Sequence, residues 1–517
     1  MEEQQNNHLF GYYKPLRNHL YKIKVDDGLF VVWAFVQHLQ FDQDFPTEIE
    51  VIPEFKDADH IQKIRWSSPW ELETLAKEII LNSHELVAEK TFTKWNYFSG
   101  ALNKLKALEN EIGGEYTNQE NVLIEMFRIA HRQFPWQMNP NGNFIIRHYK
   151  IFGTSDMSTI IEETTGLDTK DLYTIGMVFI GAYLKRPAIK QPINVEVRNI
   201  TTEKIDRFLK IFSISLADLK EYLKSEHQLN SKYGYAYSTL RARPIIDMTY
   251  RGEQCYVCPL PTLLFWQITN GIYYSIYKHK KFDKSFGTAF QGYVGEVLTR
   301  ALIGGTFKVL PEKQFKIGKD IKDSIDWIVS DDDSALFIEC KTKRLVFTAK
   351  SEIEDLEAIQ SELAKMSDFI IQCYKTISDY KNGHYPHLAY DSKLQIYPLI
   401  VTLEHWYVFG SKFLDSLDQL VIQKMSDLSL DLTLLKSAPY AMCSIEDFEV
   451  ATQLINVVGI KKFMESKVYD PEKKEWEFGP YINSEFKDYT KHVKSLFNDE
   501  YDELFAEFLE GHRKNLN

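Results

Sequence analysis

The sequence predicts a mixed α+β and α/β fold, with an N-terminal all-helical domain, an αβββαβ core and a helical C-terminal extension. Three observations predict it. Apolar residues recur at helical spacing through much of residues 1–238. Two apolar runs flank a short polar turn between Ser324 and Cys340, as in a β-hairpin. A long helical segment and then an apolar strand follow this hairpin, between residues 352 and 403.

The chain has 517 residues, which favours two or three domains over a single core. In the first part, apolar periodicity predicts helices over Thr91–Ile112 and Asn121–Phe134. Strands and a turn are expected within Arg241–Pro261, so the first boundary is placed near Ser238. We therefore predict a helical recognition or regulatory domain (1–238), a core domain (239–440) and a helical C-terminal extension (441–517).

The core is expected to contain one helix, three strands, a second helix and a last strand. These elements are a helix over Phe286–Ile303, a strand over Thr306–Ile317, hairpin strands over Ser324–Val329 and Ala335–Cys340, a helix over Glu352–Tyr380, and a strand over Leu394–Leu403. Helical segments are predicted afterwards at Leu414–Met425 and Ile445–Asn456, and a helical tail beyond them could hold a partner protein or a second copy of the chain.

The hairpin carries the residues that suggest chemistry. Asp326 lies five residues before Asp331, and Glu339 lies five residues after Ser334, so a symmetric turn sets the two acids opposite one another. Because side chains alternate along a strand, Glu339 and Lys341 share one face and Cys340 takes the other. The sequence thus predicts two carboxylates and one ammonium group on a common surface.

Facing carboxylates repel, and a cation is the usual means of offsetting that repulsion. Oxygen ligands suit Mg²⁺, with Mn²⁺ as a substitute. Such an ion can polarise a phosphoryl oxygen and acidify a bound water, while Lys341 orients that water or stabilises developing charge. Glu296, the only acid in the predicted helix over Phe286–Ile303, is a further candidate ligand.

This pattern resembles the PD-(D/E)XK nuclease superfamily, over roughly Phe286 to Leu403. The resemblance implies catalytic and metal-binding roles for Asp326 and Glu339, a catalytic role for Lys341, and a helical glutamate at Glu296. It also implies that the backbone carbonyl of Cys340 joins the metal shell. Ile325 stands where the family has proline, and Gln372 with Tyr374 matches a glutamine and tyrosine of RecB-type members at a different spacing.

Composition separates the core from the rest of the chain. The formal net charge is -12, with 44% hydrophobic and 26% charged residues, which is ordinary for a globular protein. Between Ser275 and Lys350, however, 14 Lys or Arg stand against 10 Asp or Glu, a local excess of four positive charges that phosphates could contact. These include Lys278, Lys280, Lys281 and Lys284, and Lys313, Lys316, Lys319 and Lys322. Each cluster taken alone is equally well explained as a solvated lysine-rich face.

Five cysteines, no signal-like N-terminus and no long apolar run predict a cytoplasmic protein without membrane association. The leading hypothesis is a Mg²⁺-dependent endonuclease acting on DNA in restriction or anti-phage defence, and two alternatives stay open. These are a ribonuclease using the same site, and a catalytically silent nucleic-acid-binding scaffold with the same fold. The chain is expected to form a homo-oligomer or to bind a partner protein of a defence system.

Overall fold

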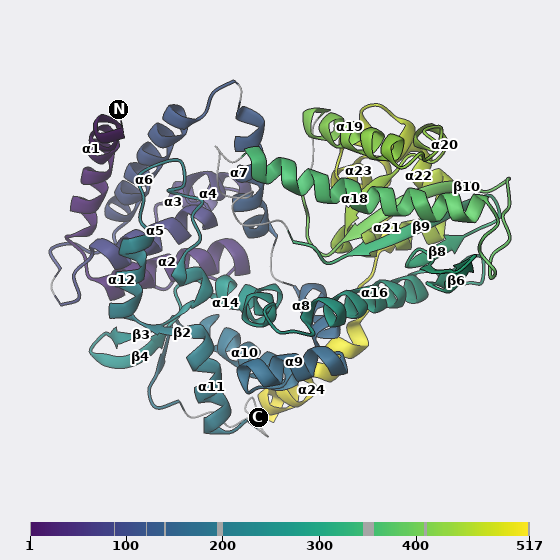
Figure 1. The fold of residues 1–517 in the computed structure, drawn as a ribbon. Coiled ribbons are helices and arrows are strands. Elements are labelled where there is room, and N and C mark those ends of the chain that lie inside the picture. Colours follow the sequence, from purple (N-terminus) through teal and green to yellow (C-terminus); the bar gives the residue numbers. More distant parts are fainter. Residues whose placement is uncertain are drawn as a thin grey trace.

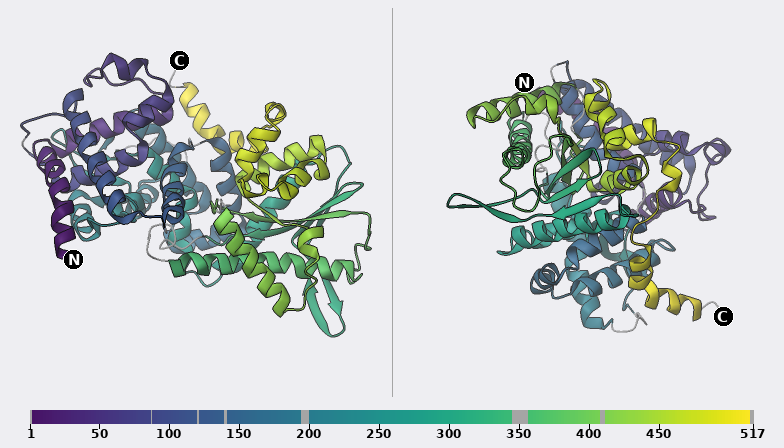
Figure 2. Two further views of the ribbon diagram at one scale, coloured as in Figure 1. Left: turned by 90° about the horizontal axis from the view of Figure 1, so that it is seen from above. Right: turned by 90° about the vertical axis from the view of Figure 1, so that its right-hand side faces the viewer.

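The protein is a mixed α+β structure, seen here in a computed structural model that describes residues 2–86, 88–119, 121–138, 141–193, 200–344, 356–407 and 411–514. Figures 1 and 2 show two lobes, one of N-terminal helices and one built around a sheet. Within the described ranges, no helix combines the length and the apolar character that crossing a membrane requires.

The first lobe contains mainly helices and one four-stranded sheet of order β1-β4-β3-β2. Its elements, with those that lead to the second lobe, are α1 (Glu2–Leu20), α2 (Val25–Phe41), α3 (Pro53–Asp57), α4 (His60–Trp66), α5 (Pro69–Asn82), α6 (Trp95–Tyr116), α7 (Val122–Gln137), α8 (Gly142–Phe152), α9 (Ser155–Thr165), α10 (Thr169–Tyr183), β1 (Ala188–Lys190), α11 (Thr202–Phe212), β2 (Ser213–Ser215), α12 (Leu216–Glu226), α13 (Thr239–Ala242), β3 (Ile245–Tyr250), β4 (Glu253–Val257), α14 (Pro261–Ile268), η1 (Asn270–Ile272) and α15 (Tyr273–Ile276).

The second lobe is built on a five-stranded sheet of order β11-β10-β9-β8-β5. Its elements are α16 (Phe282–Ala301), β5 (Lys308–Pro311), β6 (Gln314–Ile317), β7 (Asp320–Asp323), β8 (Trp327–Ser330), β9 (Ser334–Lys341), α18 (Leu356–Lys381), β10 (Gln395–Thr402), α19 (Ser411–Asp427), α20 (Leu434–Ser437), β11 (Ala441–Ser444), α21 (Ile445–Val458), α22 (Ile460–Tyr469), η2 (Lys473–Glu475), α23 (Phe478–Glu485), η3 (Thr490–His492) and α24 (Asn498–Lys514).

Helices cover both faces of the second sheet (Figure 1). Alternation along β9 sends Leu336 and Ile338 into a core shared with α16 and α21, and sends Phe337 into a core shared with α18 and α19. Strands β9, β10 and β11 run parallel, whereas β8 and β5 add antiparallel strands at one edge. The face toward α16 and the face toward α18 therefore present different side chains of the same strand.

The predicted strand over Thr306–Ile317 is two strands in the structure. Its first half is β5, which pairs with β8, and its second half is β6, which forms a separate hairpin with β7. The remaining core elements lie close to their predicted positions, although residues 352–355 of the predicted helix over Glu352–Tyr380 fall outside the described residues. The order αβββαβ thus holds with one inserted hairpin.

Strand pairing crosses the predicted domain boundaries in two places. Residues 1–238 are not all-helical, because β1 and β2 pair with β4 and β3, which lie beyond Ser238. The segment 441–517 is not a separate helical extension, because it begins with β11, a strand of the main sheet. The cores explain why: α8, α9 and α10 pack with α16 and with the C-terminal helices, so each lobe draws on distant parts of the sequence.

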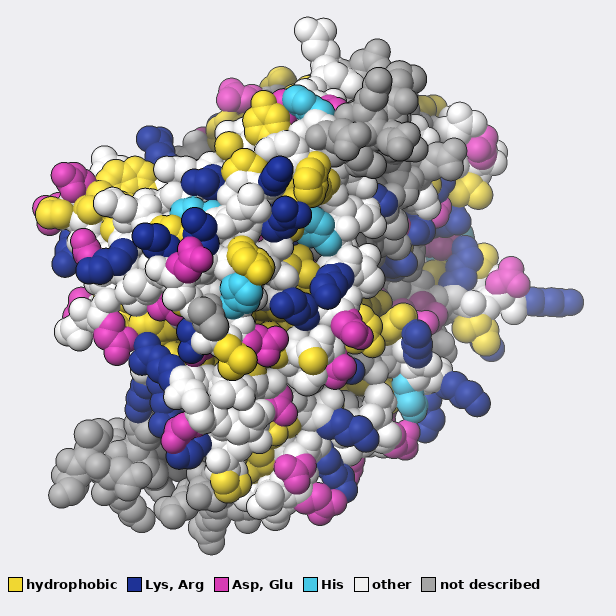
Figure 3. All heavy atoms as spheres, turned by 90° about the vertical axis from the view of Figure 1, so that its left-hand side faces the viewer, with side chains coloured by type: hydrophobic (Ala, Val, Ile, Leu, Met, Phe, Trp, Pro, Cys, Tyr) yellow, Lys and Arg dark blue, Asp and Glu magenta, His cyan; other side chains and the backbone are white. Residues whose placement is uncertain are grey.

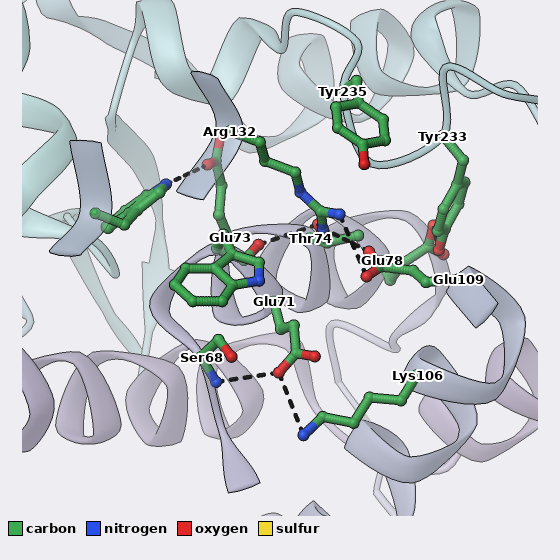
Figure 4. Close-up of polar contacts among 12 residues, drawn as sticks. Ser68, Glu71, Glu73, Thr74, Glu78, Lys106, Glu109, Arg132, Tyr233 and Tyr235 are labelled. Atoms are coloured by element: carbon green, nitrogen blue, oxygen red, sulfur yellow. Dashed lines mark hydrogen bonds and ion pairs between the residues drawn. The ribbon is translucent and has the colours of Figure 1, made fainter. Parts of the chain in front are cut away.

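Polar groups buried on α5 hold the first lobe together (Figure 4). Glu71 completes a capping box with Ser68 and lies 3.4 Å from the ammonium of Lys106. Glu78 accepts hydrogen bonds from the hydroxyl of Tyr233 at 2.8 Å, and Arg132 binds Glu109 at 2.6 Å. On the outer face of this lobe, basic and acidic side chains are interspersed rather than separated by sign (Figure 3).

Close packing of α16 on the sheet requires a glycine. A Cβ atom at Gly295 would lie 2.1 Å from a ring carbon of Trp327, whereas one at Gly292 meets nothing within 4 Å. Gly295→Ala should therefore lower the midpoint of thermal unfolding, with an overpacking cost of about 1–3 kcal/mol. Gly292→Ala is the matched control and should raise the midpoint slightly, because alanine favours the helix. Equal midpoints for the two variants would contradict this packing.

Candidate active site

The hairpin of β8 and β9 has the register that the sequence predicts. Trp327 pairs with Ile338, so the next residues outward, Asp326 and Glu339, stand opposite one another. The backbone amide of Cys340 donates to Oδ2 of Asp326 at 2.7 Å and holds that carboxylate at the strand end. At the other end, Oδ1 of Asp331 accepts from the amide of Ser334 at 2.9 Å and closes the turn.

Glu339 and Lys341 face α18, as alternation along β9 requires. Nζ of Lys341 lies 2.5 Å from Oε1 of Glu339 and donates to Oε1 of Gln372 at 3.0 Å. The same ammonium lies 5.1 Å from the ring centre of Phe369. Gln372 therefore takes part in the cluster, whereas the hydroxyl of Tyr374 donates to the carbonyl of Ala438 in the core.

Glu339 is buried with too few hydrogen-bond partners. Glu339 is only 2% exposed, and its Oε2 has no hydrogen-bond partner among the described residues. Burial raises the pKa of Asp326, and burial together with the charge of Asp326 raises the pKa of Glu339. Burial opposes the charge on Lys341, but attraction to Glu339 outweighs it and raises the pKa of the ammonium.

This donor set fits a hard divalent cation. Two facing carboxylates supply oxygen ligands, and the free Oε2 of Glu339 is a buried acceptor that a cation would satisfy. Asp326 and Glu339 would hold the ion. Cys340 supplies its amide to Asp326 and turns its side chain toward the core on the α16 side, so a metal-binding role for its carbonyl stays a prediction.

The structure does not bring Glu296 to this cluster. Its helix, α16, packs on the opposite face of the sheet from Glu339 and Lys341. The Glu296 carboxylate is 48% exposed and lies 2.7 Å from Nζ of Lys150 on α8. The role of Glu296 as a catalytic residue and metal ligand stays a prediction that this arrangement does not support, because its side chain points toward α8.

Glu312 is the acid that sequence reasoning missed. It follows β5 directly, and its backbone amide donates to the carbonyl of Asp326 at 2.7 Å. Its negative charge contributes to the raised pKa of both Asp326 and Glu339. Oε2 of Glu312 accepts from the side-chain amide of Gln291 at 3.0 Å. Glu312 directly precedes a lysine-rich segment, and this position in the sequence gave little sign that its charge acts on Asp326 and Glu339.

A second group of potential metal ligands lies at the ends of β10 and β11. His405, Asp447 and Glu477 each present one ligand atom, and these atoms all lie within 4.8 Å of one another. Nε2 of His405 is 3.1 Å from the hydroxyl of Ser444, and burial raises the pKa of both acids. The three residues come from separate segments, so no local motif marks them.

We expect the acid pair to make stability depend on pH and metal. Because the folded-state pKa values of the two carboxyl groups are raised, these groups stabilise the fold most at pH values below their unfolded-state pKa values, near 4. This stabilisation is lost as the pH rises through the folded-state pKa values. Without metal, the unfolding midpoint of the wild type should therefore fall more between about pH 5 and about pH 8 than that of Glu339→Gln.

Millimolar Mg²⁺ should reduce that difference, because it binds the ionised pair in the folded state. Calorimetry of both proteins at each pH, with and without Mg²⁺, measures it. Identical pH dependence of wild type and Glu339→Gln would argue against a buried, mutually repelling pair.

Comparison with known protein families, with curated proteins and with solved structures gives no match for this chain.

Proposed function

We propose that the protein is a Mg²⁺-dependent nuclease that hydrolyses phosphodiester bonds in DNA, on a restriction-endonuclease-like core. The observation that supports it best is the convergence of Asp326, Glu339 and Lys341 at one strand end, with an unsatisfied carboxylate oxygen among them. The resemblance to PD-(D/E)XK nucleases adds a role in restriction or anti-phage defence to the proposal.

Each side chain has a distinct part in this mechanism. Asp326 and Glu339 would bind the ion, which supplies Lewis-acid polarisation of the phosphate and a water of lowered pKa. Lys341 keeps its proton because its pKa is raised, so it can donate a hydrogen bond to the attacking water or to a phosphoryl oxygen on which negative charge develops. Gln372 accepts from Lys341 and keeps the ammonium directed at the carboxylate pair.

The lysine-rich hairpin offers a surface for the substrate backbone. The backbone hydrogen bond between Glu312 and Asp326 is followed by one from the amide of Ser324 to the carbonyl of Lys313. Beyond this bond the two segments pair as β6 and β7. This hairpin projects from the sheet (Figure 2), and Phe315 anchors it on Tyr385, 5.0 Å between ring centres. Its exposed lysines thus begin next to the acid pair, where they can contact phosphates on either side of the cleaved bond.

Removal of any of the three central groups should abolish cleavage. We expect Asp326→Asn, Glu339→Gln and Lys341→Ala each to lower the Mg²⁺-dependent rate by at least about a hundredfold, with unchanged circular dichroism. Asp332→Asn, an exposed acid in the same hairpin turn, is the matched control and should cut normally. Glu296→Gln should also retain cleavage, since its carboxylate pairs with Lys150.

The assay compares plasmid, linear duplex, single-stranded DNA and RNA with and without Mg²⁺ or Mn²⁺. Normal cleavage by all three central variants would overturn the site assignment. Metal-dependent degradation of RNA alone would favour the ribonuclease alternative. Binding of nucleic acid without turnover by the wild type would favour the scaffold alternative.

Gln372 should affect turnover more than substrate binding. Gln372→Ala leaves Lys341 with one acceptor fewer, so we expect kcat to fall about tenfold while KM changes little. Lys375→Ala, an exposed substitution one turn further along α18, is the control and should behave as wild type. A change in KM alone would show that Gln372 contacts substrate rather than positioning Lys341.

A further inference from the structure

A cavity of about 260 Å³ lies where the two lobes meet, apart from the acid pair. The first lobe contributes Lys77, Tyr235 and Arg241 to its walls, and α14 contributes Trp266. The second lobe contributes Arg344 and the segment 403–405 that follows β10. The volume is slightly below the usual range of small-molecule pockets, so it suits a small ligand and excludes a nucleic-acid duplex.

Three of the five cations in the lining already make hydrogen bonds to acidic partners. Arg132 binds Glu109, as Figure 4 shows, and Arg241 lies 2.5 Å from Glu73. Arg147 makes a bidentate pair with Glu449, at 2.6 and 2.9 Å. These pairs build the wall and neutralise it. Lys77 and Arg344 are the cations left to interact with a ligand.

Arg344 is a buried cation whose donors are not satisfied. Its side chain is 5% exposed, and neither Nε nor Nη2 has a hydrogen-bond partner in the part of the chain that the structure describes. Glu404 lies 3.3 Å from Nε but does not accept a hydrogen bond from it. Arg344 also lies 4.2 Å from the ring centre of Tyr273. A buried guanidinium with unsatisfied donors is costly, and a phosphate group matches its paired donors.

Lys77 and the aromatic lining extend this chemistry. Lys77 makes no hydrogen bond or ion pair with another described residue. Burial lowers its pKa, although the charge of Glu73 offsets part of this shift. An anion in the cavity would offset the free-energy cost of burying the charged ammonium of Lys77. Tyr274, 52% exposed, and Tyr237, 40% exposed, line the same space, and aromatic rings are surfaces on which a base can stack.

We propose that this cavity binds a nucleotide, with its phosphate on Arg344 and Lys77 and its base against the tyrosines. The nucleoside phosphate is either a free nucleotide or the phosphorylated end of a nucleic-acid strand. Binding does not depend on the proposed nuclease activity.

The cavity is connected directly to the candidate active site. Arg344 lies three residues after Lys341 in the sequence, and the amide of Leu403, another lining residue, donates to the carbonyl of Lys341 at 3.2 Å. A phosphate that draws Arg344 toward it would therefore shift the end of β9, which carries Lys341. We expect occupancy of the cavity to change the cleavage rate, a regulation that rests on the proposed function.

Calorimetric titration of the full-length protein tests the binding. The probes are AMP, ATP, and a short single-stranded oligonucleotide with either a 5′-phosphate or a 5′-hydroxyl. At least one phosphate-bearing probe should bind, and Arg344→Gln and Tyr274→Ala should each weaken that binding about tenfold or more. Arg186→Gln, an exposed arginine outside the cavity, is the control and should bind as wild type.

Tyr274 is exposed, so Tyr274→Ala keeps the test valid if Arg344→Gln fails to fold. The tighter of free nucleotide and 5′-phosphorylated strand identifies the natural source. Absence of binding by every phosphate-bearing probe at millimolar concentration, or unchanged binding by both variants, would overturn the proposal. Repeating the titration with Glu339→Gln separates the two ideas, because that protein should bind the nucleotide normally even though it cannot cleave.

Discussion

The antiparallel register of β8 against β9 is the constraint on which the candidate active site depends. It sets Asp326 opposite Glu339, and the hydrogen bond from the amide of Cys340 holds Asp326 in place. Two carboxylates fixed in this way repel one another, and Lys341 compensates only one oxygen of Glu339. The remaining oxygen creates the demand for a cation, and the nuclease proposal rests on that demand.

The two faces of the sheet differ in what they carry. Its α18 face carries Glu339, Lys341 and the accepting amide of Gln372, while its α16 face is closed by close packing at Gly295. Because β11 and the helices after it belong to the same lobe, the C-terminal part of the chain supports the site rather than forming an appendage. The first lobe and this assembly both line the cavity that contains Arg344, near the end of β9.

Much of the core was predictable from sequence because its signals are local. A symmetric turn sets the pairing of Asp326 with Glu339, and strand alternation places Lys341 on the same face. Glu296 does not join the cluster, because the sequence of a helix does not determine which of its sides meets which face of a sheet. Glu312 and the His405–Asp447–Glu477 group depend on long-range pairing, which no local pattern records. The predicted domain boundaries do not coincide with the two cores for the same reason, since both cores combine distant segments.

The most direct test is to locate bound Mn²⁺ in crystals by anomalous diffraction at the manganese edge. The account predicts a strong anomalous peak between the carboxylates of Asp326 and Glu339, and its loss in crystals of Glu339→Gln. A peak confined to His405, Asp447 and Glu477, or no peak at either group, would contradict the claim that the hairpin acids form the metal site.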